Sequence, residues 1–152
     1  MDNNYNIIGE VPAGYSGVGY LVVRVFTARG AIPIGGALVT VSYADASMPS
    51  PYAVLTTDKS GRTPKISLPT PPLSLSLSPS DTSVYPRSDP YALYNVQIMR
   101  DGFYTVNDLN VRIFAGITAI QDADLVPKAE SLPQTYYTDD SVYIDGGTED
   151  GL

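Results

Sequence analysis

The stretch that decides the fold is GYLVVRVF, at residues 19–26. Leu21, Val23 and Val25 form one apolar face of this segment, and the residues between them form a mixed face. An alternation of period two is typical of a strand with one face in a core. The segment therefore predicts a β-strand rather than a helix.

Outward from this segment the same alternation returns along the chain. Further runs of β-branched and aromatic residues occupy 38–43, 54–57, 66–68, 94–99, 111–113 and 117–121. Turn residues separate them, such as Asp58 with Gly61 and Asp101 with Gly102. No 12-residue window keeps a helical period. The chain from 19 to 127 is therefore predicted to be an all-β, seven-stranded β-sandwich. Nine residues are expected in its core: Leu21, Val23, Val25, Val39, Val41, Val96, Ile98, Val111 and Ile113.

The stretch 64–90 holds seven of the 13 prolines. Leucine and serine alternate within it at 73–78, which is the pattern of an edge strand with one apolar face, and prolines suit an edge. Two interpretations stay open: a surface connection that braces one end of the sandwich, or a groove for a partner.

Two tails are predicted around the sandwich, at residues 1–18 and 128–152. The C-terminal tail is acidic, because residues 129–152 contain six acids and no base. This segment carries −6 of the chain's net charge of −7. The N-terminus shows neither a basic region nor an apolar region of a secretory signal peptide.

The order of the motifs resembles a carboxypeptidase regulatory-like domain, in its bacterial variant. The resemblance rests on 19–26, on PIGGALVTV at 33–41, on TDKSGR at 57–62 and on YNVQIMRDGFY at 94–104. It implies a Greek-key, transthyretin-like sandwich with extended N- and C-terminal tails, in which Asp58 and Gly61 shape a turn. Such domains serve as spacers, stalks or accessory modules, which implies an extracellular location or a cell or spore surface.

The composition excludes most catalytic chemistry. The chain has no histidine and no cysteine, so the usual zinc ligands, nucleophile–histidine pairs and histidine bases are missing. Fold relatives that use histidine, the intradiol dioxygenases among them, are excluded in the same way. Relatives with an internal isopeptide bond need a lysine where this chain has Arg24, and arginine stays protonated. We therefore predict no catalytic site, no cofactor and no metal.

The acidic residues allow weaker alternatives. The tail carboxylates between Asp139 and Asp150 offer oxygen ligands for calcium, although not in an EF-hand spacing. Asp122 and Asp124 are expected to form ion pairs with Arg112 or Arg100. A hydrolase that uses two carboxylates would draw its pair from Asp101, Asp108, Asp122 and Asp124, and nothing in the sequence singles out one pair.

Charge and hydropathy also limit the partners. A net charge of −7 and a pI near 4.3 argue against nucleic acid, and no apolar run is long enough to span a membrane. Twelve tyrosines leave a glycan open as a partner, because exposed aromatic rings stack on sugar faces. Tryptophan is absent, however, and core or rim packing explains the tyrosines at strand positions: Tyr20, Tyr43, Tyr94 and Tyr104.

Two functions follow as hypotheses. The first is a non-enzymatic structural subunit that self-associates into a surface filament or lattice, because β-prone tail segments can add to the sheet edges of a neighbouring copy. The residues expected to carry this assembly are Tyr5, Ile7, Tyr136, Tyr137, Val142, Tyr143 and Ile144. The alternative is an accessory binding module that recognises a glycan or a protein partner.

Overall fold

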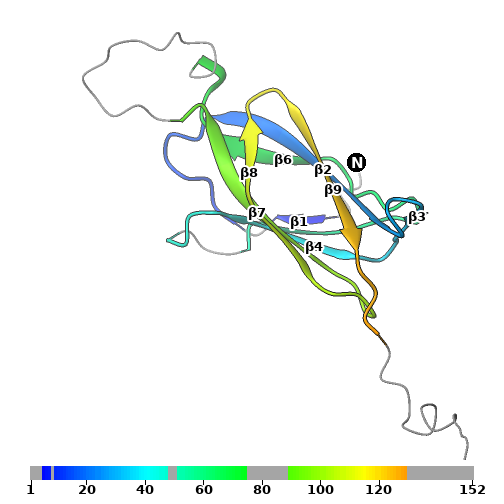
Figure 1. Ribbon diagram of the computed structural model, residues 1–152. Coiled ribbons are helices and arrows are strands. Elements are labelled where there is room, and N and C mark those ends of the chain that lie inside the picture. Colours follow the sequence, from blue (N-terminus) through cyan, green and yellow to red (C-terminus); the bar gives the residue numbers. More distant parts are fainter. Residues whose placement is uncertain (1–4, 8, 48–50, 75–88, 130–152) are drawn as a thin grey trace, which may run out of the picture.

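The computed structural model describes residues 5–7, 9–47, 51–74 and 89–129, which form two β-sheets packed face to face (Figure 1). The larger sheet has the strand order β1-β5-β4-β7-β8. Its strands are β1 (Tyr5–Ile7), β4 (Leu38–Tyr43), β5 (Ala53–Thr56), β7 (Tyr91–Met99) and β8 (Val106–Phe114). All neighbours in this sheet are antiparallel.

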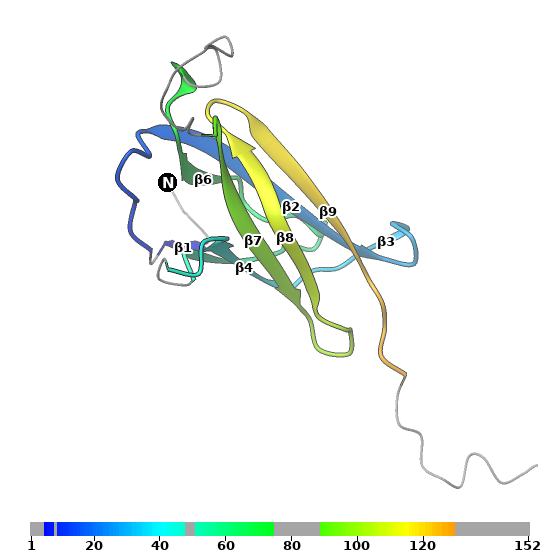
Figure 2. The same cartoon turned by 60° about the vertical axis from the view of Figure 1, so that its left-hand side comes forward.

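The smaller sheet is built around the longest strand. It contains β2 (Gly17–Thr27), β3 (Ile32–Pro33), β6 (Ile66–Thr70) and β9 (Thr118–Leu125). β2 pairs antiparallel with β3 and β6 but parallel with β9, beside which it runs in both views (Figures 1 and 2). The predicted all-β, mainly antiparallel architecture is thus confirmed. The described residues form nine strands rather than seven, because β1 and β3 are short additions.

The core lies between the two sheets and follows the predicted alternation. Eight of the nine expected core residues are buried: Leu21, Val23, Val25, Val39, Val41, Val96, Ile98 and Ile113. Val111 is the exception, since it is only half-buried and packs against the margin of the core. It lies on β8, the edge strand of the larger sheet. In the described sheet β8 has a neighbouring strand on one side only.

The turn at 58–62 forms as the sequence predicts. The Oδ1 atom of Asp58 accepts hydrogen bonds from the backbone N–H groups of Ser60 (2.8 Å) and Arg62 (3.1 Å). Gly61 has a φ of +81°, and its carbonyl accepts a 2.7 Å hydrogen bond from the N–H of Val25. This turn therefore ties the connection between β5 and β6 to the central strand β2.

The predicted N-terminal tail includes parts of both sheets. β1 pairs with β5 of its own chain, with Tyr5 opposite Leu55 and Ile7 opposite Ala53. β2 begins at Gly17, two residues before the predicted start of the sandwich. Residues 5–18 thus contain one strand and the start of another.

The leucine–serine stretch differs from its prediction where it is described. Leu73 and Ser74 have helical backbone and do not form an edge strand. They follow Pro71 and Pro72, and proline favours the first turn of a helix, where its missing N–H costs nothing. Residues 75–78 lie outside the described residues.

Within the described part, no helix is long and apolar enough to cross a membrane.

Candidate functional site: a tyrosine-lined cleft

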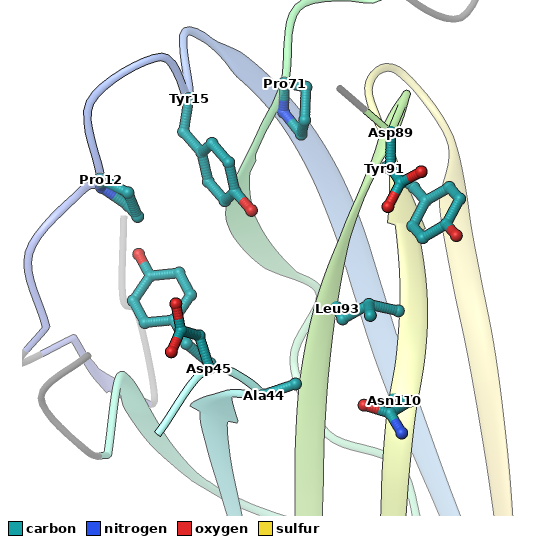
Figure 3. A pocket seen from close by; sticks show the side chains of 10 residues that line it. Pro12, Tyr15, Ala44, Asp45, Pro71, Asp89, Tyr91, Leu93 and Asn110 are labelled. Atoms are coloured by element: carbon teal, nitrogen blue, oxygen red, sulfur yellow. The ribbon is translucent and has the colours of Figure 1, made fainter. Parts of the chain in front are cut away.

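A cleft of about 570 Å³ lies at one end of the sandwich, between the loop that precedes β2 and the starts of β7 and the β4–β5 connection (Figure 3). Its wall combines aromatic rings with carboxylate and amide groups. The lining residues are Pro12, Tyr15, Tyr43, Ala44, Asp45, Pro71, Asp89, Tyr91, Leu93 and Asn110. We call this site the tyrosine cleft.

Tyr15 is presented to the cleft by a tight turn. The N–H of Tyr15 donates a 3.2 Å hydrogen bond to the carbonyl of Pro12, and Gly14 between them has a φ of +86°. A glycine with positive φ at the third of the four positions is the residue pattern of a type II turn. The sequence PAGY at 12–15 therefore fixes where the ring of Tyr15 lies.

Behind the cleft, Tyr43 belongs to a cluster of four tyrosines whose rings meet mostly edge to face. Tyr43 contacts Tyr15, Tyr52 and Tyr94, with ring centroids 6.5, 5.3 and 5.1 Å apart. The hydroxyl of Tyr43 donates to the carbonyl of Glu10 (2.7 Å), and that of Tyr94 donates to the carbonyl of Pro69 (2.5 Å). The two buried hydroxyls are thus satisfied by backbone.

The environment of the cluster keeps its tyrosines neutral. Burial, together with the neighbouring Tyr52, raises the pKa of Tyr43 to about 12. Burial also raises the pKa of Tyr94 well above its usual value. The pKa of Tyr15 is raised first by burial and then by the negative charges of Asp45 and Asp89. All three rings therefore remain uncharged at neutral pH.

A β-bulge places Asn110 at the cleft. The register between β7 and β8 shifts between Tyr94 and Val96, so extra residues of β8 lie opposite Asn95. Asn110 has a φ of +60°, and its N–H donates to Oδ1 of Asn95 at 3.0 Å. Asparagine tolerates this left-handed backbone better than most residues. Bulges of this kind re-aim a side chain, and here the result is an amide at the cleft wall (Figure 3).

The acidic residues proposed for catalysis or ion pairs lie elsewhere and have other partners. Arg24 forms a bidentate ion pair with Asp122, with both nitrogen–oxygen distances 2.6 Å, so the expected partners Arg112 and Arg100 are wrong for Asp122. The parallel register places Arg24 directly opposite Asp122. Asp124 is also without the expected arginine among the described contacts, and its Oδ1 accepts from the N–H of Gly30 (3.1 Å).

The remaining two carboxylates of that set are also separate. Asp108 accepts a 3.2 Å hydrogen bond from the side chain of Gln121. Asp101 lies in the turn between β7 and β8 and lines a smaller hollow with Arg100 and Lys128. The structure thus brings none of the four into the tyrosine cleft. Among the described residues, no group of three or more carboxylates could hold a metal ion.

Of the residues predicted to carry assembly, two are described. Tyr5 and Ile7 lie in β1 at the edge of the larger sheet, and the side chain of Ile7 is exposed. The others lie outside the described residues: Tyr136, Tyr137, Val142, Tyr143 and Ile144. The tail carboxylates considered for calcium lie outside them as well.

The cleft itself was not predicted from the sequence. Its clearest signals are PAGY at 12–15, which was assigned to a tail, and the asparagines in VNDLNV at 106–111, which interrupt the alternation of a strand. Neither signal shows which distant segments meet.

No protein-family model and no curated protein sequence matches this chain. Among solved structures, it is similar to the Bacillus anthracis TIE protein, with 16% identity and a TM-score of 0.44 over 72% of this chain and 16% of that one. It is similar to 3-chlorocatechol 1,2-dioxygenase from Rhodococcus opacus, with 11% identity and a TM-score of 0.46 over 79% of this chain and 64% of that one. It is also similar to catechol 1,2-dioxygenase from Pseudomonas arvilla, with 15% identity and a TM-score of 0.47 over 80% of this chain and 56% of that one. The chain thus spans less than two thirds of each of these structures.

Proposed function

We propose that this protein is a non-enzymatic binding module, a Greek-key transthyretin-like sandwich of the carboxypeptidase regulatory-like type, whose tyrosine cleft binds a glycan. The observation that carries the proposal is the cleft's combination of size and lining. A volume of about 570 Å³ lies within the range of small-ligand sites. Three tyrosines and three polar side chains that can bond hydroxyl groups line it.

The chemistry of the lining suits a sugar ring. The C–H groups on the face of a sugar pack against an aromatic ring, and the half-buried Tyr15 and Tyr91 offer such rings, while Tyr43 is buried behind Tyr15. The carboxylates of Asp45 and Asp89 accept hydrogen bonds from hydroxyls, and the amide of Asn110 can both accept and donate. Tyr91 is itself held in place by the ring of Phe114 and by the guanidinium of Arg112, at 5.4 and 5.1 Å. The site therefore combines a positioned platform with polar groups at its rim.

A role without catalysis is supported by the composition. The chain offers no histidine or cysteine as a base or nucleophile. The carboxylates considered for a hydrolase are engaged elsewhere, as with Asp122 and Arg24. The pKa values of Tyr15 and Tyr43 are raised, so neither hydroxyl ionises at neutral pH to a phenolate that could act as a base.

Replacement of Tyr15 by alanine tests the proposal. With a glycan identified on an array, Tyr15→Ala is expected to weaken binding about tenfold, because one stacked ring is lost. Titration calorimetry measures the change, and thermal unfolding checks that the variant folds. Tyr104→Ala, at an exposed ring outside the cleft, is the matched control and should bind normally. Equal losses in both variants, or no glycan bound at all, would contradict the proposal.

Self-association remains a second proposal, favoured by β1. This strand has three residues and pairs only with β5 among the described strands, at the edge of the larger sheet. The same segment of a neighbouring copy fits the same edge, which is the geometry of strand exchange. The tails would extend such contacts into a filament or lattice.

Light scattering and negative-stain imaging of the full chain test this second proposal. Assemblies should grow with protein concentration, and deletion of residues 1–16 should abolish them, because the exchanged strand is removed. Deletion of 130–152 separates the contribution of the acidic tail. A monomer at every concentration would refute self-association.

A further inference from the structure

The tyrosine cleft has a one-sided charge. Asp45 and Asp89 face it from opposite sides, with Tyr15 between them (Figure 3). None of the described residues that line it is lysine or arginine. The ion pair found in the described part of the chain, Arg24 with Asp122, involves neither carboxylate. Arg112 packs on the ring of Tyr91 but lines a neighbouring hollow, so the described rim of the cleft itself is anionic and favours a positively charged group.

Asp45 is held as an anion at a fixed position. Its Oδ1 atom accepts hydrogen bonds from both the backbone N–H (2.9 Å) and the hydroxyl (2.8 Å) of Ser47. These bonds lower the pKa of Asp45. Both of these bonds use Oδ1, and no donor to Oδ2 is found among the described residues, so Oδ2 can accept a hydrogen bond from a ligand.

The rings add to the attraction for a cation. The negative face of an aromatic ring attracts an ammonium group within about 6 Å. Tyr43 is buried, so the half-buried Tyr15 is the ring that the cleft offers between the two carboxylates. The charges of Asp45 and Asp89 both act on the hydroxyl of Tyr15, as the raised pKa of that group indicates. The two carboxylates therefore exert their fields on one shared region of the cleft.

We propose that the ligand carries a protonated amine, and that the tyrosine cleft selects sugars with a free ammonium group, such as the glucosamine units of a deacetylated glycan. This inference rests on the proposed glycan-binding function and specifies its substrate class. An ammonium group forms charge-assisted hydrogen bonds with the carboxylates, which are stronger than those of a hydroxyl. An acetylated amine has lost both the charge and the cation–π attraction.

Three tetrasaccharides that differ at one position of each sugar test the inference. Titration calorimetry on the full chain compares oligomers of glucosamine, N-acetylglucosamine and glucose at neutral pH. The glucosamine oligomer is expected to bind about fivefold more tightly than the other two, since the carboxylates are exposed and each contributes modestly. The preference should shrink at high salt.

Variants locate the source of the preference. In the double variant Asp45→Asn and Asp89→Asn the three oligomers should bind alike, while Asp101→Asn, at the far turn, should keep the preference. The single variant Asp89→Asn is a second check, because no hydrogen bond to Asp89 is found among the described residues. It should lower the preference about twofold.

The outcomes separate the two proposals. Neutral or acetylated oligomers that bind as tightly as glucosamine overturn this inference and leave the glycan-binding function standing. A glucosamine preference that survives in the double variant also overturns it, because the attraction then comes from elsewhere on an acidic protein. Failure of all three oligomers, with no other glycan bound on an array, overturns both.

Discussion

Replacement of Gly61 by alanine is expected to destabilise the sandwich by about 3 kcal/mol. Gly61 has a φ of +81°, a conformation that costs other residues about 1–2 kcal/mol. A methyl group at this position would also lie 2.4 Å from the carbonyl oxygen of Val25, in the central strand β2. Relief of that clash requires backbone shifts of the kind that cost about 1–3 kcal/mol. Urea unfolding followed by circular dichroism measures the loss.

Gly102→Ala is the matched control for this prediction. Gly102 has a φ of +86°, and a methyl group there would meet no atom within 4 Å. This variant carries the conformational cost alone, so it should lose only about 1 kcal/mol. Equal losses in the two variants would show that the close approach of the 58–62 turn to β2 is not what requires glycine.

Alkaline pH is expected to unfold the protein through its buried tyrosines. In the unfolded chain tyrosine ionises near pH 10. In the folded chain Tyr43 keeps its proton up to about pH 12, and the pKa of Tyr94 is raised as well. The unfolded state therefore binds fewer protons above pH 10, and stability falls as pH rises. The free energy of unfolding falls by about 1.4 kcal/mol per pH unit for each such tyrosine between pH 10 and 12. Below pH 10 the stabilisation from the protonated tyrosine is fully present.

Urea unfolding at several pH values between 8 and 12 measures this slope. Tyr94→Phe removes one ionisable group and should flatten the slope by about 1.4 kcal/mol per unit. It should also lower the stability at pH 8 by about 1–3 kcal/mol, because the carbonyl of Pro69 loses its donor. Tyr104→Phe, at an exposed ring, controls for the removal of a hydroxyl. An unchanged slope in Tyr94→Phe would refute the prediction.

The strands could be predicted because each one carries its own local pattern. Leu21, Val23 and Val25 point into the core for the reason that their spacing indicates, and Asp58 and Gly61 form the turn that their residue types favour. The pairing of strands is not local. Arg24 and Asp122 are 98 residues apart, and only the parallel register of β2 and β9 places them opposite each other.

The cleft could not be predicted because its residues come from separate segments. Tyr15 precedes β2, Asp45 follows β4, and Asn110 depends on a bulge in β8. A tyrosine next to a strand is as consistent with a core as with a binding platform. Indeed Tyr94 lies wholly in the core, Tyr43 is buried but reaches the wall of the cleft, and Tyr91 is half-exposed there. The register of the sheet and the turn at Gly14 decide between these roles.

The parallel pair of β2 and β9 also has a mechanical consequence. The two strands are paired without interruption from Tyr20 with Thr118 to Thr27 with Leu125. The chain enters β2 at one end of this ladder and leaves β9 at the other. A pull along the chain would therefore slide one strand past the other and load all hydrogen bonds between them together. In an antiparallel hairpin pulled at its ends, the hydrogen bonds break one at a time. Among the described strands, β1 would detach before this ladder yields, because it has only three paired residues. If the sandwich were linked in a row with other domains, tension along the row would shear the hydrogen bonds between β2 and β9. That is the direction in which the sandwich resists unfolding most.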